Sequence, residues 1–392
     1  MFKKSLPFAA TLLLSLLTSC QQEDPASSRP ANPSSLNKTI SGNIVIPDTV
    51  VVTNADSIIV RDANPAPDPS DTLGLGGSLA VAPGFAYGAD PSWMTEMESF
   101  NKSFYNNSGV QQDLFTVLRG KGINAIRLRL WVNPAKGWCN TRDVLAKALR
   151  AKAAGMRVLI DIHYSDVWAD PANQVKPTAW AGRNGSALYT SVYNFTLNTM
   201  RLLKSNGVAP TWVQVGNETN DGMLWPEGRA SLSSTNFQQF AYMINSGRNA
   251  VKSVFPYAKV IVHIANGNDN TRARWLFDGL RTHGANWDVC GFSVYPTASN
   301  WAANNTQVAA NLRDMASRYG KQVMVCEAGM SVSDAGPCKS FLLDLVAKTQ
   351  AVPGGIGVFY WEPESYGDWY KYGKGAFSDN GRPTIAMDAF MH

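Results

Sequence analysis

Two glutamates that follow predicted strands carry the most specific chemical signal in the sequence. Val213–Glu218 reads VQVGNE, an apolar strand that ends in an amide and a carboxyl group. Val323–Glu327 reads VMVCE, and strand alternation is expected to place Val323, Val325 and Glu327 on one inward face. Glycoside cleavage needs an acid for the leaving oxygen, a second carboxylate, and a group that holds the sugar 2-hydroxyl. These residues therefore predict a carbohydrate hydrolase.

The elements that would position these residues alternate between strand and helix from Gly84 onward. β-Rich runs begin roughly 30 to 55 residues apart, which suits repeated strand–helix units. The expected strands are Phe85–Ala89, Ala125–Leu130, Arg157–Ile162, Trp212–Val215, Val260–Ile264, Val289–Val294, Gln322–Cys326 and Gly357–Tyr360. The expected helices include Asp143–Ala154 (with Thr141 as N-cap and Gly155 just past its end), Ala187–Lys204, Asn236–Val254, Asn304–Tyr319 and Lys339–Val352.

Strict alternation predicts a (β/α)8 TIM barrel over residues 79–392. A doubly wound sheet is disfavoured because the first strand leads into Asp90-Pro91-Ser92 and not into a Gly-rich phosphate turn. Active residues of such barrels lie where strands end and the following loops begin. The residues at these positions are Asp90, Arg127 or Arg129, His163, Glu218, Tyr295, Glu327 and Trp361.

The first residues resemble a bacterial lipoprotein signal peptide. Lys3 and Lys4 precede the apolar stretch Leu6–Leu17, which is too short to span a bilayer and leads to Cys20. We expect residues 1–19 to be removed, Cys20 to be lipidated, and the protein to be anchored in the outer membrane. The acidic run Gln21–Asp24 resembles the export tag that sends some lipoproteins to the cell surface.

A Pro/Ser/Asn-rich segment follows the cysteine and is expected to act as a tether over residues 20–78. Within it, Asn43–Ile46 and Ser57–Val60 have strand-like composition. Cys290 and Cys326 lie in expected strands and are predicted to be buried thiols. Cys139 and Cys338 are both predicted to lie in loops, and the sequence leaves open whether they form a disulfide.

The composition and the histidine and cysteine spacing argue against nucleic acid and metal ions as partners. The formal net charge of +5 comes without a basic run, which gives no support to a nucleic-acid partner. The chain has four histidines, of which only His163 and His263 are near strand ends, and no C-x-x-C or H-x-H pair. This spacing disfavours a metal-dependent hydrolase. We expect no cofactor and a monomer.

Several longer motifs resemble the endo-β-1,4-galactanases of glycoside hydrolase family 53. The motifs are Gly88–Ser92 (GADPS), Arg127–Pro134 (RLRLWVNP), Asp161–Pro171 (DIHYSDVWADP), Gln214–Glu218 (QVGNE), Ser293–Pro296 (SVYP), Cys326–Gly329 (CEAG) and Tyr360–Pro363 (YWEP). The Asn-Glu pair and the late glutamate are shared by a large retaining clan of barrels, whereas DIHYSDxWADP and YWEP are much more selective. Some family members hold a structural calcium in a long loop after the eighth strand. That loop is short here, so the sequence does not support calcium.

The resemblance implies a retaining enzyme that cleaves β-1,4-galactosidic bonds in galactan or type I arabinogalactan. Glu218 would be the acid/base and Glu327 the nucleophile, and we expect Arg129 to keep Glu327 ionised. Asn217 would bind the 2-hydroxyl, Tyr295 would orient Glu327, and Trp361 would stack under the sugar. The residues expected to line neighbouring subsites are His163, Asp90, Asp166 and Trp225. A clan relative with another glycan, such as a β-mannanase, and a non-catalytic surface glycan-binding lipoprotein remain alternatives.

Overall fold

The computed structural model describes residues 50–54, 57–60 and 84–391. Two strands precede the main domain: β1 (Val50–Asn54) pairs antiparallel with β2 (Ser57–Val60). The strand expected at Ser57–Val60 is therefore present. The strand expected at Asn43–Ile46 lies outside the described residues, as do the signal peptide and Cys20.

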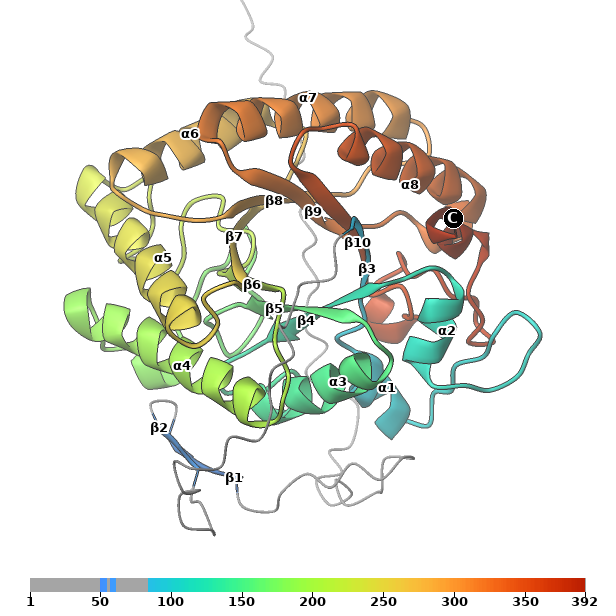
Figure 1. The fold of residues 1–392 in the computed structure, drawn as a ribbon, viewed down its shortest axis with the longest axis horizontal. Helices are drawn as coiled ribbons and strands as arrows, with labels where there is room; N and C mark the ends of the chain where they lie inside the picture. Colours follow the sequence, from blue (N-terminus) through green and yellow to red (C-terminus); the bar gives the residue numbers. More distant parts are fainter. Residues whose placement is uncertain (1–49, 55–56, 61–83, 392) are drawn as a thin grey trace, which may run out of the picture. The chain divides into compact units, whose positions relative to one another are not determined.

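The main domain is a closed barrel in the order β10-β3-β4-β5-β6-β7-β8-β9, surrounded by a ring of helices (Figure 1). All of its strand pairs are parallel, and the barrel closes where Trp361 lies beside Asp90 in the register of β10 and β3. The barrel strands are β3 (Ala86–Asp90), β4 (Ala125–Leu130), β5 (Arg157–Ile162), β6 (Trp212–Val215), β7 (Lys259–Ile264), β8 (Val289–Val294), β9 (Gln322–Ala328) and β10 (Gly355–Trp361). The sequence prediction of a (β/α)8 barrel is confirmed, with strand bounds shifted by at most two residues.

The helices are longer and more numerous than the sequence indicated. They are α1 (Met94–Ser99), α2 (Leu114–Gly120), α3 (Thr141–Ala153), α4 (Gly185–Ser205), α5 (Ser234–Val254), α6 (Asn270–Thr282), α7 (Trp301–Tyr319) and α8 (Ala335–Gln350). Helix α3 is capped by Asn140, whose side chain accepts from the Asp143 N–H, so the prediction of Thr141 as N-cap was wrong by one residue. No helix within the described ranges is both long and apolar enough to cross a bilayer.

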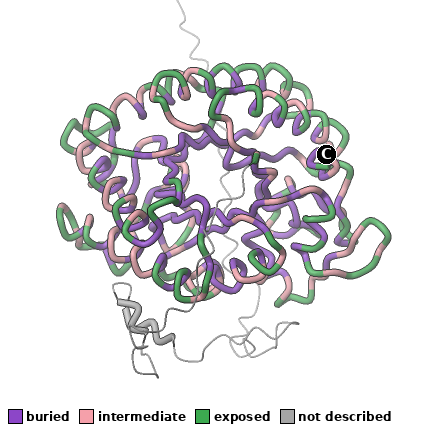
Figure 2. The backbone as a smooth tube through the Cα atoms, in the orientation of Figure 1, coloured by how far each residue is buried: buried purple, intermediate pink, exposed green. Residues whose placement is uncertain are grey.

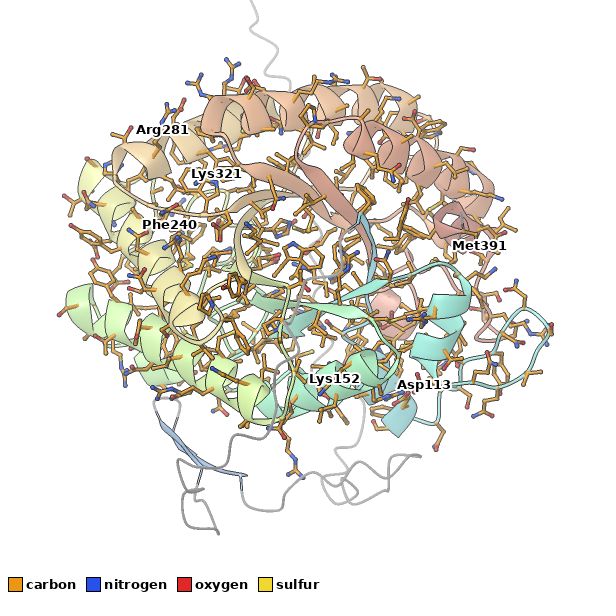
Figure 3. The ribbon with its side chains drawn as sticks, in the orientation of Figure 1. Asp113, Lys152, Phe240, Arg281, Lys321 and Met391 are labelled. Atoms are coloured by element: carbon orange, nitrogen blue, oxygen red, sulfur yellow. The ribbon has the colours of Figure 1, made fainter. Side chains whose placement is uncertain are left out.

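The core consists of two layers of side chains, one on each side of the barrel wall, and the barrel strands between them are mostly buried (Figure 2). A large outer layer lies between strands and helices, and Phe240 of α5, labelled in Figure 3, is fully buried in it. A small inner layer fills the barrel with one or two side chains from every barrel strand: Ala86, Ala125, Leu159, Trp212, Ile261, Val289, Met324, Cys326 and Phe359. Full burial of such a side chain contributes about 1.5–3 kcal/mol for the larger apolar types.

The inner layer corrects one sequence prediction. Met324 and Cys326 belong to it, whereas Val323 and Val325 belong to the outer layer. Phe292 of β8 pairs with Val325, but Ser293 pairs with Glu327, so the register skips Cys326. This β-bulge reverses the alternation and brings Glu327 onto the same side of the sheet as Ser293, although Val323 and Val325 face outward.

The cysteines are free thiols in the described part of the chain. Cys290 and Cys326 are buried, as expected. Cys338 lies in α8 and not in a loop, and its Sγ is 3.8 Å from Tyr360 Oη. The Cys139 Sγ instead contacts the Ser92 carbonyl at 3.6 Å, so the two residues do not form a disulfide.

Candidate active site

The inward-facing rows of the barrel change from apolar to polar toward the carboxyl ends of the strands. On β5 the row is Leu159 and Asp161, continued by His163 just after the strand, and on β7 it is Ile261 and His263. This follows from the period of two in a strand, which repeats one face every second residue. The polar end of the barrel is therefore where buried side chains can do chemistry, in agreement with the general rule for this fold.

Glu218 stands on a sharp turn just after β6. Its φ is +43°, in the left-handed region that favours glycine, and it follows Gly216 with φ +83°. Gln174, from the loop between β5 and α4, holds this turn by donating its side-chain amide to the Asn217 carbonyl at 2.9 Å. Strained residues of this kind persist when the surroundings fix them, and they gather at functional sites.

The carboxyl group of Glu218 is held by one short hydrogen bond. The Ser293 hydroxyl donates to its Oε1 at 2.6 Å. Burial, and secondly the charge of Glu327, raise the pKa of Glu218 to about 8, although the bond from Ser293 opposes this rise. Glu218 therefore carries a proton at neutral pH, as a general acid must.

Glu327 has the opposite surroundings. Its Oε1 lies 2.9 Å from Arg127 Nη2, and its Oε2 accepts from the Tyr295 hydroxyl at 2.8 Å. Burial is the largest influence and leaves the pKa of Glu327 raised, while Arg127 and Tyr295 act to lower it and so favour the carboxylate form. Of the two glutamates, Glu218 is thus the one that holds a proton, and Glu327 is the one stabilised as a carboxylate.

Both glutamates depend on strand β8. Ser293 and Tyr295 lie two positions apart at its carboxyl end, so their side chains share one face. Ser293 donates to Glu218 and Tyr295 donates to Glu327. The expected contact of Tyr295 with Glu327 is present, whereas the sequence reading gave Ser293 no role.

Arg127 is the cation of the site, and this corrects the expectation for Arg129. Arg127 is buried and forms ion pairs with Asp90 at 2.6 Å, Asp161 at 2.9 Å and Glu327 at 2.9 Å. Asp90 is fully buried and helps to position Arg127, and its predicted place in a neighbouring subsite stays a prediction. The three neighbouring carboxylates raise the pKa of Arg127, although burial acts to lower it.

Arg129 lies further along the same inward row and meets different partners. Its Nη1 pairs with Glu362 Oε1 at 2.8 Å, and its guanidinium carbon lies 4.1 Å from the ring centroid of Trp168. It lies two positions after Arg127 along β4, so it reaches the loop that follows β10 and not Glu327. Arg129 therefore packs against an aromatic residue of the site, Trp168, and does not contact either catalytic candidate.

His163 is satisfied by protein groups. Its Nε2 is 2.9 Å from Asp161 Oδ2, and its Nδ1 accepts from the Ala169 N–H at 3.1 Å. It is buried, and burial lowers its pKa, so it is neutral and positions the loop after β5. That His163 lines a subsite stays a prediction. Asp166 is partly buried and accepts backbone N–H groups of Asn133 and Thr178 at 2.9 Å each.

The remaining expected binding residues surround the two glutamates or lie in adjacent loops. Asn217 accepts from Arg127 at 2.9 Å and donates one amide hydrogen to the Ala169 carbonyl at 2.8 Å. Trp361 packs edge-on against Tyr372 with ring centroids 4.7 Å apart. Trp225 is partly buried, and its indole donates to the Asp221 carbonyl at 3.0 Å. Substrate binding by Asn217, Trp361, Trp225 and Asp166 stays a prediction.

Sequence reasoning missed several polar residues that connect these groups: Asp161, Gln174, Gln214, His263 and Ser293. Gln214 donates to Asp161 and accepts from Arg127, whereas His263 contacts Ser293. Four of the five lie within strands, and although His263 was noted near a strand end, the sequence reading gave none of the four a role in the site. Their inward position was readable from the period of two, since each is two residues from an inner-layer or site residue.

Comparisons with known proteins identify the family. The profile described as glycosyl hydrolase family 53 matches residues 86–389. A probable arabinogalactan endo-beta-1,4-galactanase A from Aspergillus fumigatus is 34% identical over 310 residues, covering 73% of this chain and 86% of that protein. The arabinogalactan endo-beta-1,4-galactanase of Thermothelomyces thermophilus is 35% identical over 299 residues, covering 70% and 88%.

Solved structures are similar over the barrel. A structure from a study of two fungal beta-1,4-galactanases matches with a TM-score of 0.72 and 31% identity, covering 79% of this chain and 99% of that one. The catalytic domain of an Ignisphaera aggregans protein of the same family matches with a TM-score of 0.71 and 29% identity, covering 80% and 98%. The resemblance inferred from the motifs is confirmed, and the chain is a glycosidase that belongs to glycosyl hydrolase family 53.

Proposed function

We propose that this protein is a retaining endo-β-1,4-galactanase that hydrolyses galactan, including type I arabinogalactan. The observation that carries the proposal is the pairing of each glutamate with its own partner, Ser293 for Glu218 and Tyr295 with Arg127 for Glu327. The names of the fungal relatives support galactan as the substrate.

In the first step, Glu218 gives its proton to the glycosidic oxygen as the bond to the anomeric carbon breaks. Glu327, held as a carboxylate by Arg127, attacks that carbon and forms a covalent glycosyl-enzyme. Because the pKa of Glu218 is raised to about 8, its proton is present at the pH where Glu327 is ionised.

In the second step, the roles of Glu218 change. Once Glu327 is an ester it has lost its charge, and the second-largest cause of the raised pKa of Glu218 is gone. The pKa of Glu218 therefore falls, and its carboxylate removes a proton from the water that hydrolyses the ester. The sugar leaves with its original anomeric configuration.

The sugar at the cleavage point would be held by Asn217 and Trp361. One Asn217 amide hydrogen is used by the Ala169 carbonyl, which leaves the second for the 2-hydroxyl. Trp361 is held edge-on by Tyr372 and would stack under the ring. Asp166 and Trp225 would contribute to neighbouring subsites.

The test of substrate class is incubation of the purified protein with linear β-1,4-galactan, mannan, xylan and cellulose. The expected result is release of short oligosaccharides from galactan, with little from the other three. If short oligosaccharides are released mainly from mannan, the protein is a related glycanase and not a galactanase. Binding of galactan without any hydrolysis would identify a glycan-binding protein and contradict the proposal.

The protein would act as a monomer at the cell surface, anchored to the outer membrane through lipid on Cys20. The signal-like residues 1–19 and the cysteine support this location. Expression in a Gram-negative host with labelled palmitate should label the native chain and not the Cys20→Ser variant. Equal labelling of both chains, or of neither, would contradict the anchor.

A further inference from the structure

His263 is a buried histidine that no step above uses. It lies on β7, is fully buried, and its Nε2 is 2.9 Å from the Ser293 Oγ. Ser293 in turn donates to Glu218 Oε1 at 2.6 Å. His263 is thus one hydroxyl away from the general acid, yet no substrate can reach it.

His263 is neutral in this environment. Burial, and secondly the charge of Arg127, hold the pKa of His263 well below its ordinary value, and Asp161 opposes them only in part. His163 is a further titratable neighbour, and it too lowers the pKa of His263. A neutral imidazole has one N–H, so one ring nitrogen donates and the other accepts.

The contacts at Nδ1 show which nitrogen accepts. The Glu218 backbone N–H points at Nδ1 with a separation of 3.4 Å, and Gln214 Nε2 lies 3.0 Å from it. Asn217 Oδ1 is also near, at 2.9 Å, but it already accepts from Arg127 and from Gln214. A proton on Nδ1 would leave the Glu218 N–H without its partner, which is unfavourable for a buried donor.

The proton of His263 therefore lies on Nε2, where it is donated to the Ser293 hydroxyl. Ser293 has one hydrogen, and with its oxygen already accepting from His263 that hydrogen is directed to Glu218 Oε1. Among the described residues, Glu218 Oε2 has no protein hydrogen-bond partner, and the Glu218 side chain remains partly exposed.

We infer that His263, acting through Ser293, keeps the acid proton of Glu218 on Oε2, the oxygen available to substrate. This inference deepens the proposed function and rests on it. His263 is a positioning residue, since it touches neither substrate nor the reacting atoms. Without it, the Ser293 hydroxyl could accept instead of donate, and the acid proton would then lie on Oε1, away from the glycosidic oxygen.

The proton path is complete without any other group. The Oε2 proton passes to the glycosidic oxygen as the bond to the anomeric carbon breaks, and the leaving sugar departs as an alcohol. Glu218 is left as a carboxylate whose Oε1 still accepts from Ser293. In the second step Oε2 takes a proton from the attacking water, which restores the starting arrangement.

The test compares two leaving groups. Galactan has a poor leaving group that needs the acid proton, whereas a 2,4-dinitrophenyl β-galactobioside has one that departs without it. We would measure kcat/KM, which reports the first step, for Ser293→Ala, His263→Leu and His263→Gln. The Gln side chain retains an N–H near the position of Nε2. Ser191→Ala, another buried hydroxyl on α4, is the matched control.

For Ser293→Ala and His263→Leu we expect kcat/KM on galactan to fall about 10²-fold or more, in the range that general acids contribute. On the dinitrophenyl substrate the fall should be less than about tenfold, and His263→Gln should recover most of the galactan activity. Ser191→Ala should change neither. If His263→Leu does not fold, His263→Phe takes its place as the variant without a ring N–H, because Ser293→Ala by itself does not test His263.

Equal losses on the two substrates for Ser293→Ala would overturn the inference, because they indicate a general disturbance of the site. Undiminished galactan hydrolysis by that variant would overturn it as well. Failure of the proposed function is seen separately, in the native protein: if it cleaves another β-glycan, the same comparison is made with that glycan and its dinitrophenyl glycoside.

Discussion

Arg127 Nη2 lies 2.9 Å from Glu327 Oε1, at the centre of a buried cluster in which the same guanidinium also pairs with Asp90 and Asp161. A buried cation stabilises the ionised form of its partners. The relationship identifies Arg127, and not Arg129, as the residue that stabilises Glu327 as a carboxylate.

Replacement of these two arginines should give different pH profiles. Arg127→Lys loses the planar fork that reaches three carboxylates, so the pKa of Glu327 should rise and the acid limb of kcat/KM should move to higher pH. Arg129→Lys, the matched control on the same strand, should leave the acid limb in place. A shift of the acid limb in Arg129→Lys alone would contradict the assignment.

The pKa of Glu218 should depend on the charge of Glu327. In the native enzyme we expect activity to fall above about pH 8, where Glu218 loses its proton, and to fall at low pH, where Glu327 gains one. In Glu327→Gln the neighbouring charge is absent, so the pKa of Glu218 should fall. Carbon-13 NMR titration of labelled glutamate carboxyls measures it directly. An unchanged or higher pKa would show that the two carboxyl groups do not interact.

Azide should distinguish the roles of the two glutamates. In Glu327→Ala, which should fold normally but lose activity, azide can attack the anomeric carbon from the vacated side and give an α-galactosyl azide. In Glu218→Ala with an aryl glycoside, azide should instead attack the glycosyl-enzyme and give the β-azide. Substantial hydrolysis of galactan by Glu327→Ala without azide would show that another residue is the nucleophile.

Tyr295→Phe should weaken catalysis without weakening the fold. The Tyr295 hydroxyl donates to Glu327 at 2.8 Å, and a hydrogen bond to a charged group contributes about 1.5–3 kcal/mol. The expected loss in kcat/KM is roughly 10- to 100-fold, with a thermal midpoint close to that of the native protein. A large fall in the midpoint with a proportionate loss of folded protein would indicate a structural role instead.

Chelation should leave activity intact. The two histidines near the site both have their ring nitrogens bonded to protein groups, His163 to Asp161 and His263 to Ser293. In the part of the chain that the structure describes, no three His, Cys, Asp or Glu side chains gather as metal ligands. Dialysis against EDTA should therefore not change the initial rate on galactan, and a loss restored by calcium or zinc would contradict this account.

The barrel was predictable because its strands are short apolar runs separated by helices. Ala125–Leu130 and Arg157–Ile162 were predicted with their observed bounds. Both faces of a barrel strand are buried, so its residues are mostly apolar, apart from polar side chains that point into the barrel. Helix α6 was not predicted, although its apolar stripe of Ala273, Leu276, Phe277 and Leu280 is regular. Its many charged and polar residues obscured that stripe.

The two glutamates were predictable because an apolar run that ends in a carboxyl group is rare in chance sequence. Their partners were not, because side-chain direction depends on local register. The bulge at Cys326 reverses which residues of β9 face inward, and the sequence VMVCE contains no pattern that predicts a bulge. Likewise Arg127 and Arg129 share one face of β4, and only the position along the barrel axis decides which one meets Glu327.

Proton NMR of the first products from linear β-1,4-galactan tests the central claim most directly. In the proposed mechanism Glu327 attacks the sugar and Glu218 donates the proton, so the anomeric carbon is inverted twice. The newly formed reducing end should therefore appear first as the β-anomer and then mutarotate. Early accumulation of the α-anomer would contradict the account, because it would mean that water, and not Glu327, attacks the sugar.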